Sequence, residues 1–135
     1  MKTHNYSRQR QAILDFLGTR KDHPTAEVIY RNVQETFPRI SLGTVYRNLN
    51  LLADDGSIRR VKGLNGSEHF DADTSDHQHF LCRKCGSVSD IFPADPEPVE
   101  KLTSAAMSVF RGKITGSDIY FHGLCERCAA ELPVA

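Results

Sequence analysis

The sequence has 135 residues and a mass of 15.1 kDa, which fits one ordinary domain or two small ones. No apolar run approaches the roughly 20 residues of a membrane-spanning helix. The N-terminal residues 1–4 are not followed by the apolar region of a secretion signal. We therefore expect a cytoplasmic protein with no membrane segment.

The net charge is zero, but the charges are unevenly distributed. Residues 1–62 carry eleven Lys and Arg against six Asp and Glu, whereas residues 63–135 carry six against eleven. Such asymmetry is typical of a basic half that faces DNA and an acidic half that collects metal ions. A chance imbalance of surface charge is the alternative that composition leaves open.

The first half is expected to form three helices and a hairpin. Helical spacing of apolar residues predicts helices at about residues 7–17, 25–37 and 42–54. The residues expected to cap their N-termini are Ser7, Thr25 and Ser41. The turn at residues 38–41 is short, so the second and third helices predict a helix–turn–helix.

Two short strands are predicted after the third helix, at residues 58–62 and 67–70. The residues between them end in Asn65-Gly66, a strong signal for a hairpin turn. Three helices and a hairpin form a winged helix, which we assign to residues 1–72.

A polar hinge is predicted at residues 73–78, followed by a small α/β dimerisation domain at residues 79–135. This second domain should contain strands at residues 79–82 and 87–92, a helix at 100–110 and a strand at 113–121. The fold class is therefore α+β.

The four cysteines of the sequence form two Cys-x-x-Cys pairs, Cys82/Cys85 and Cys125/Cys128. Four thiolates suit a structural Zn²⁺ ion, because soft sulfur matches this borderline-soft metal. A thioredoxin-like redox pair is the rival interpretation, but it requires a βαβ frame that neither pair has. We therefore predict a zinc site that joins the first strands of the second domain to its tail.

A second group of metal-binding residues surrounds His77 and His79. Alternation along a strand places these two side chains on the same face. Asp71 precedes them and Asp90 follows, and a set of nitrogen and carboxylate donors suits Fe²⁺, Mn²⁺ or Zn²⁺. Spacing alone leaves open whether either aspartate, or His23, shares an ion with them, and a surface histidine pair is the alternative.

The other histidines are assigned no metal. His4 and His122 are expected at the terminus and in packing or solvent, and His69 is expected on the surface of the wing although it alternates with Asp71. In the third helix, four residues have side chains suited to bases and phosphates: Thr44, Tyr46, Arg47 and Asn48. All but Tyr46 are expected to point away from the core; a solvated helix face is the alternative.

Several stretches resemble the ferric uptake regulator (Fur) family. Residues 41–49 resemble its recognition helix, and residues 23–27 resemble the segment before its second helix. Residues 77–86 look like its metal signature and residues 123–128 like its closing cysteine pair. The resemblance covers nearly the whole chain in order. Residues 6–10 depart from it, because relatives often have a Thr-Pro-Gln-Arg motif there after a leading helix.

Within the family, the chain is most similar to the peroxide-sensing repressors. Their regulatory ion is held by three histidines and two aspartates, and the matching positions here are His23, Asp71, His77, His79 and Asp90. The iron-responsive branch tends to carry Glu where Asp71 stands. Residues of the accessory metal site of that branch are replaced here by Asp76 and Gln78.

The resemblance implies a metal-dependent transcriptional repressor rather than an enzyme. Each subunit of a homodimer would hold one structural Zn²⁺ and one regulatory Fe²⁺ or Mn²⁺, and the dimer would bind a double-stranded DNA operator with paired half-sites. Peroxide would be the signal, through oxidation of His77 or His23. A repressor that responds to iron, manganese or zinc supply is the alternative within the family, and a thiol oxidoreductase is the alternative from another class.

Overall fold

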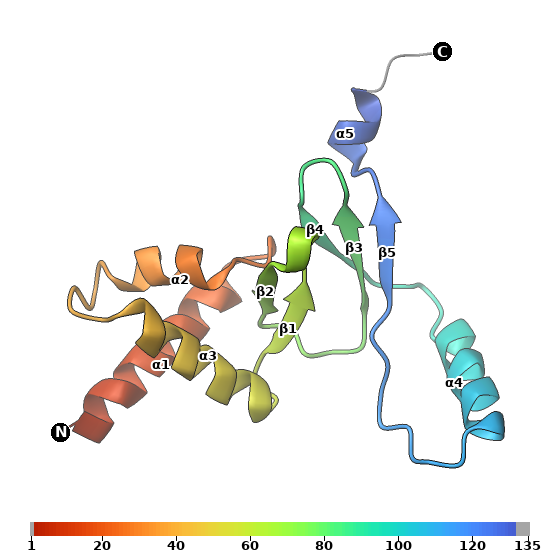
Figure 1. Cartoon of the computed structure of the whole chain (residues 1–135), viewed down its shortest axis with the longest axis horizontal. Helices are drawn as coiled ribbons and strands as arrows, with labels where there is room; N and C mark the ends of the chain where they lie inside the picture. Colours follow the sequence, from red (N-terminus) through yellow and green to blue (C-terminus); the bar gives the residue numbers. More distant parts are fainter. Residues whose placement is uncertain (1, 132–135) are drawn as a thin grey trace.

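The computed structural model describes residues 2–131, with side chains described from residue 8 onward. Its elements separate into two parts that lie side by side along the long axis of the molecule (Figure 1). One part consists of three helices and a two-stranded sheet, and the other of a three-stranded sheet with two further helices. The predicted α+β fold class is confirmed.

Three helices form the N-terminal part: α1 (Lys2–Gly18), α2 (Ala26–Val33) and α3 (Leu42–Asp54). The predicted caps at Thr25 and Ser41 are confirmed, because their hydroxyl oxygens accept the backbone N–H of Val28 and Thr44. The cap predicted at Ser7 is wrong, since α1 already begins at Lys2; the side chain of Ser7 lies outside the described residues.

The three helices share one apolar core. Its fully buried members come from all three helices and from the segment that follows them: Ile13, Leu17, Ala26, Ile29, Val33, Val45, Leu49, Leu52, Ile58 and Phe70. Their spacing of three or four residues along each helix places them on one face, which is why the sequence pattern predicts these helices well. This core belongs to the N-terminal part alone.

The wing is the antiparallel pair β1 (Arg59–Lys62) and β2 (Glu68–Asp71). A short 3₁₀ turn, Leu64–Gly66, joins the strands. Asn65 and Gly66 both have positive φ values, 56° and 77°, as the predicted Asn-Gly hairpin requires. On its other side β2 contacts the segment before α2, where Thr25 pairs with His69.

The second part is built on a sheet with the strand order β4-β3-β5. Its strands are β3 (Gln78–Cys82), β4 (Val88–Ile91) and β5 (Tyr120–Gly123). β3 pairs antiparallel with β4 and parallel with β5. The strand predicted at residues 113–121 is wrong in extent, because only residues from 120 onward have a partner strand.

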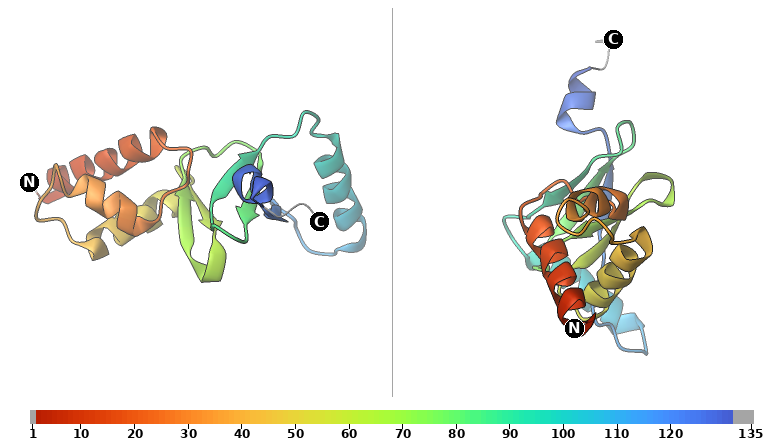
Figure 2. Two further views of the ribbon diagram at one scale, coloured as in Figure 1. Left: turned by 90° about the horizontal axis from the view of Figure 1, so that it is seen from above. Right: turned by 90° about the vertical axis from the view of Figure 1, so that its left-hand side faces the viewer.

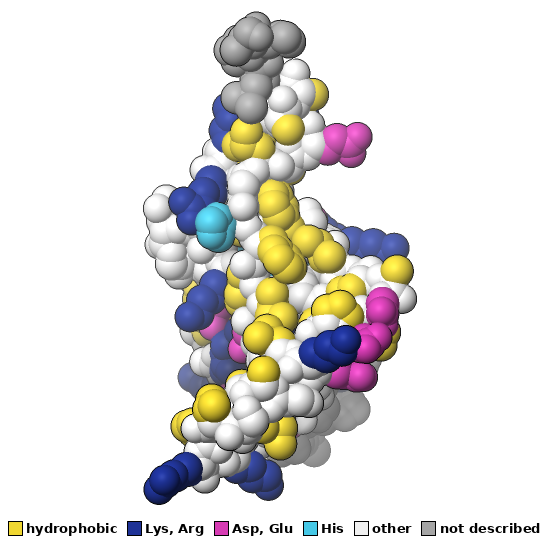
Figure 3. Space-filling model, turned by 90° about the vertical axis from the view of Figure 1, so that its right-hand side faces the viewer, with side chains coloured by type: hydrophobic (Ala, Val, Ile, Leu, Met, Phe, Trp, Pro, Cys, Tyr) yellow, Lys and Arg dark blue, Asp and Glu magenta, His cyan; other side chains and the backbone are white. Residues whose placement is uncertain are grey.

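Two helices complete this part, α4 (Glu97–Val109) and α5 (Glu126–Ala130). No residue of α4 is buried, although it carries Leu102, Met107 and Val109. Hydrophobic side chains gather on the face seen from the right-hand side of Figure 1, the side on which α4 lies (Figure 3). Among the described residues, no helix has the length and apolar character needed to cross a membrane.

The two parts contact each other beside the wing (Figure 2). The guanidinium of Arg59 in β1 lies 3.2 Å from the carboxylate of Asp118, in the loop before β5. The backbone N–H of Lys62 donates to the hydroxyl oxygen of Tyr120 at 3.3 Å. These contacts hold β5 against the wing. The turn before α2 lies against the three-stranded sheet, where His23 contacts Asp90 of β4.

Candidate metal centres

Five residues of the predicted regulatory site converge where the two parts of the molecule meet. His23 comes from the turn between α1 and α2, and Asp71 ends β2. His77 lies directly before β3, His79 within β3, and Asp90 in β4, opposite His79. Four of them, all except His77, offer ligand atoms that lie within 4.8 Å of one another. His77 reaches the same carboxylates, as its distances show.

The Nε2 atoms of all three histidines surround the same two carboxylate oxygens. Asp71 Oδ2 lies 3.1, 3.0 and 3.4 Å from Nε2 of His23, His77 and His79. Asp90 Oδ1 lies 2.7, 2.9 and 3.5 Å from the same three atoms. Ligands about 2.1 Å from one ion and at right angles to each other would be separated by about 3 Å. The spacing therefore fits five ligands of a single ion.

Hydrogen bonds alone do not account for these contacts. Each Nε2 atom carries at most one proton, yet each lies near two carboxylate oxygens. In addition, Nδ1 of His77 donates to the carbonyl oxygen of Ser75 at 2.7 Å. With its proton on Nδ1, the His77 ring can direct the lone pair of Nε2 toward the two carboxylates, an arrangement that a bound cation stabilises.

Burial strengthens the electrostatic interactions in this site. All three histidine side chains are at most 2% exposed, and the carboxylate of Asp71 is 7% exposed. Burial acts to lower the pKa of His23, but its hydrogen bond with Asp71 and the charges of both carboxylates raise that pKa above its usual value. Burial likewise opposes ionisation of Asp71, but hydrogen bonds from His23 and His79 hold its pKa well below the usual range. Asp71 is thus an anionic carboxylate at neutral pH.

Aromatic rings hold two of the imidazoles in place. The ring of His77 stacks on Phe92, with centroids 4.7 Å apart, and the ring of His79 stacks on Tyr120 at 5.6 Å. The sequence gives no signal that Phe92 or Tyr120 belongs to the site. No spacing pattern could have found them, because each contacts its histidine only through the strand pairing of the second sheet.

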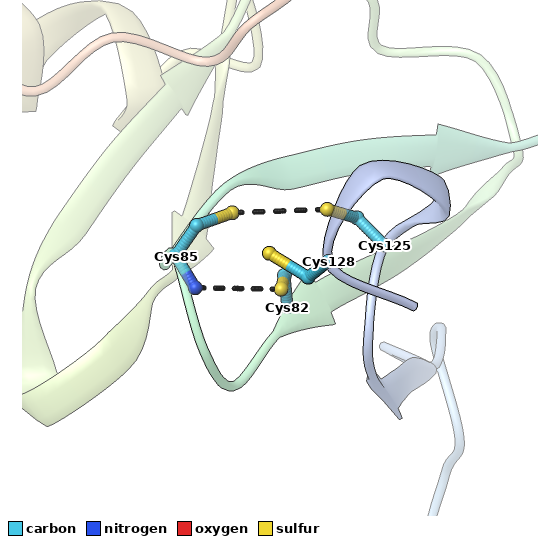
Figure 4. A group of neighbouring side chains, drawn as sticks. All are labelled: Cys82, Cys85, Cys125 and Cys128. Atoms are coloured by element: carbon cyan, nitrogen blue, oxygen red, sulfur yellow. Dashed lines mark hydrogen bonds between the residues drawn. The ribbon is translucent and has the colours of Figure 1, made fainter. Parts of the chain in front are cut away.

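The four cysteines form a separate cluster at the far end of the second sheet (Figure 4). Cys82 ends β3, Cys85 lies in the following turn, Cys125 caps α5 and Cys128 lies within it. Their sulfur atoms all lie within 4.8 Å of one another, and Sγ of Cys85 is 3.8 Å from Sγ of Cys125. Four sulfurs about 2.3 Å from a tetrahedral Zn²⁺ ion would be separated by about 3.8 Å. The geometry fits zinc, and all four thiols are free of disulfides.

The thiols of this cluster differ in acidity. The backbone N–H of Cys85, which donates to Sγ of Cys82 at 3.4 Å, is the main cause that lowers the pKa of Cys82 to about 5. A hydrogen bond with Ser87 also lowers the pKa of Cys85. Burial, by contrast, raises the pKa of Cys128 to about 12. A thiolate is therefore ready at one corner of the cluster, as zinc binding requires.

The family model described as the ferric uptake regulator family matches residues 2–121 of this chain. The chain belongs to this family. The peroxide-responsive repressor PerR of Staphylococcus epidermidis is 35% identical over 123 residues, which cover 91% of this chain and 80% of that protein. This Fur-family chain is thus a regulator of transcription of the metal-responsive type, and members of the family are not enzymes.

Solved structures agree with this assignment. The Campylobacter jejuni peroxide stress regulator matches with a TM-score of 0.78 and 27% identity, covering 94% of this Fur-family chain and 95% of that one. The Vibrio cholerae ferric uptake regulator matches with a TM-score of 0.67 and 30% identity, covering 87% and 88%. The chain is similar to both a peroxide regulator and an iron regulator.

The third helix of this Fur-family chain differs from expectation at one position. Arg47 is exposed, and Thr44 and Tyr46 are half-buried, the Tyr46 hydroxyl donating to Glu27 at 3.0 Å. The prediction that Asn48 points away from the core is wrong, because Asn48 is only 3% exposed. Its amide donates to the carbonyl of Thr44, and its oxygen accepts Nε–H of Arg10. The DNA contacts of all four residues remain a prediction.

Contrary to the expectation from the sequence, His69 does not lie free on the surface of the wing. It is half-buried, and its ring hydrogen-bonds to the carbonyl oxygen of His23. His122, in contrast, is exposed on β5, as expected. The expectation for His4 lies outside the described side chains.

Proposed function

We propose that this chain is a metal-dependent, DNA-binding repressor that senses peroxide through oxidation of a histidine ligand. The observation that carries the proposal is the convergence of His23, Asp71, His77, His79 and Asp90 around a common point. These residues have the types and order found in the peroxide-sensing branch. The site would hold one Fe²⁺ or Mn²⁺ per subunit, and the cysteine cluster one Zn²⁺.

The position of the site explains how metal binding would control DNA binding. His23 and Asp71 belong to the DNA-binding part, whereas His79 and Asp90 belong to the second sheet. An ion that binds all of them binds only the closed arrangement of the two parts, so it shifts the population towards that arrangement. In the Vibrio cholerae relative, the solved structure reveals a rearrangement of the DNA-binding domains. The closed arrangement would match the spacing of two operator half-sites.

The exposed apolar face of α4 supports a homodimer. Val109 is 85% exposed and Leu102 60% exposed, and Phe121 on β5 is 52% exposed. Apolar patches of this kind mark interfaces between proteins. A dimer would bury this face and present one α3 helix from each subunit to the paired half-sites of double-stranded DNA.

The dimer can be tested by placing a charge on this face. The Val109→Glu substitution should convert the dimer to a monomer in sedimentation velocity measurements, because an unpaired carboxylate would be buried in the interface. Arg111→Glu, at an exposed position beyond the helix end, serves as the control and should remain dimeric. A Val109→Glu protein that remains fully dimeric would place the interface elsewhere.

The proposed oxidation of a histidine by hydrogen peroxide needs no further reactant to balance its atoms and electrons. One oxygen of hydrogen peroxide ends on a ring carbon of His77 or His23 and the other leaves as water, so the imidazole loses two electrons and peroxide gains two. Fe²⁺ would supply the one-electron chemistry that opens the O–O bond. Asp90, at 17% exposure the most open of the five side chains, marks the side from which peroxide can approach. An oxidised imidazole is a poorer ligand, so the closed arrangement and DNA affinity would be lost.

The test compares two metal forms of the full-length, zinc-loaded protein. After peroxide treatment, the Fe²⁺ form should carry 16 mass units more on His77 or His23, as one oxygen atom adds, and should lose DNA binding. The Mn²⁺ form should show neither change, since Mn²⁺ does not readily give up an electron to peroxide. Loss of DNA binding without oxygen on either histidine would reject the mechanism.

A repressor that responds to metal supply is the second candidate. The similarity to an iron regulator favours it, as does a ligand set that accepts Fe²⁺, Mn²⁺ or Zn²⁺. It predicts DNA binding that follows the concentration of the free metal ion and is unaffected by peroxide in both metal forms. The same two-metal comparison therefore separates the candidates.

A further inference from the structure

His23 occupies a strained position that its own side chain does not explain. Its φ is 56°, in the left-handed region that residues other than glycine rarely adopt. Its Nδ1 atom is buried and has no partner among the described residues. Histidines that bind metals usually donate this second nitrogen to a partner that fixes the ring, as His77 does to Ser75. Apart from the contacts of Nε2 with the two carboxylates, the orientation of His23 therefore depends on its backbone.

The backbone of His23 is held by His69. Nδ1–H of His69 donates to the carbonyl oxygen of His23 at 2.6 Å. Because a carbonyl only accepts, Nδ1 carries the proton, and Nε2 of the same ring lies within hydrogen-bond distance of the Ser67 hydroxyl, at 3.1 Å. A further hydrogen bond fixes the same segment, from the N–H of Phe70 to the carbonyl of Pro24 at 3.0 Å.

The sequence leaves space for this arrangement at Gly63. A Cβ atom at this position would collide with Nε2 of His69 and Oγ of Ser67. The N–H of Gly63 also donates to the carbonyl of Ser67 at 2.8 Å, which closes the turn of the wing. The hydrogen-bonded chain from Ser67 through His69 to His23 thus connects the wing turn with the turn that carries a metal ligand.

We propose that His69 is a positioning residue: by holding the His23 carbonyl, it fixes the His23 imidazole for metal binding and links that ligand to the wing. The inference rests on the proposed regulatory site, because His69 acts through His23. His69 does not contact the two carboxylates around which the ligands converge. His69 therefore acts on metal binding indirectly, because it sets the position of one ligand, the His23 imidazole.

Two substitutions separate the hydrogen bond from simple packing. His69→Leu removes the donor and fills the space with an apolar side chain, whereas His69→Asn keeps an N–H donor at the position of Nδ1. Titration of Mn²⁺ into the zinc-loaded, full-length protein should show at least about tenfold weaker binding for His69→Leu. His69→Asn should restore affinity to within about threefold of the wild type. His122→Leu, on exposed β5, is the control and should bind Mn²⁺ like the wild type.

A second readout needs no regulatory metal. In Mn²⁺-free protein, hydrogen exchange at the Phe70 amide should be faster in His69→Leu and normal in His69→Asn. If the leucine variant does not fold, His69→Ala replaces it, because alanine also lacks a donor and adds no bulk. Unchanged Mn²⁺ affinity in the variant without the donor, or equal weakening in the asparagine variant, would overturn the proposal. Failure of the wild type to bind Mn²⁺ would instead reject the regulatory site, while the exchange experiment would still decide the role of His69.

Discussion

At Gly63 the structure leaves no room for a side chain. Its φ of −112° is open to any residue, so the Gly63→Ala substitution acts only through the collision with His69 and Ser67. We expect a loss of about 1–3 kcal/mol in the free energy of unfolding. Mn²⁺ binding should weaken as well, because the His69 ring must move. Urea denaturation and Mn²⁺ titration measure the two effects.

Gly18→Ala is the matched control for this prediction. A Cβ at Gly18 meets nothing within 4 Å, so alanine there should leave Mn²⁺ affinity unchanged and stability equal or slightly higher. If Gly63→Ala behaves like Gly18→Ala in both measurements, the wing turn is loose enough to absorb the collision.

Individual residues of the site could be predicted to different degrees. His77 and His79 are two residues apart, and strand alternation alone indicates that they share a face. His23 lies 48 residues before Asp71, and no local pattern joins them; only the family resemblance did. The role of His69 could not be predicted, because its partner is a backbone carbonyl whose position depends on the fold of the preceding turn.

Within α3, neighbouring residues should have opposite effects. Arg47 is exposed, so Arg47→Ala should weaken DNA binding by about 1–3 kcal/mol and change the free energy of unfolding by less than about 0.5 kcal/mol. Asn48 is buried and joined to Arg10, so Asn48→Ala should cost about 1–3 kcal/mol of stability.

Fluorescence anisotropy with a duplex selected by the wild-type protein measures the first effect, and urea denaturation the second. The reverse outcome, with Arg47→Ala destabilising the fold and leaving DNA binding intact, would show that α3 does not read DNA.

Helices and the hairpin were the most predictable elements, because the signals that specify them are local. The apolar spacing of α2 and α3, the caps Thr25 and Ser41, and the Asn-Gly turn all lie within a few residues of what they determine. The pairing of β3 with β5 is different, since the two strands are separated by a sheet strand and a helix. Alternation at residues 113–119 therefore predicted a strand where no partner strand is available.

For the whole molecule, the cysteine cluster should stabilise only the second part. We expect Cys125→Ser to lower the zinc content from about one ion per chain to near zero and to expose β3 and β5 to rapid hydrogen exchange. The amides of the N-terminal core should remain protected, because that core contains no residue of the second sheet.

Ser89→Ala, at an exposed position in β4, is the control and should keep both zinc and protection. Collapse of protection throughout the chain would contradict the view that the N-terminal core is self-sufficient. The predicted boundaries at residues 72 and 79 depend on this view and remain a proposal; in the structure, β2 ends at Asp71 and β3 begins at Gln78.

The parallel pairing of β3 with β5 also affects the order of events during protein synthesis. The last buried residue of the N-terminal core is Phe70, and Ala72 packs against it, so the ribosome releases everything that this core needs while the rest of the chain is still being translated. β3 has to wait for β5, and the thiol cluster for Cys128. Until then β3 exposes an unpaired edge, which makes the nascent second half a candidate for chaperone protection.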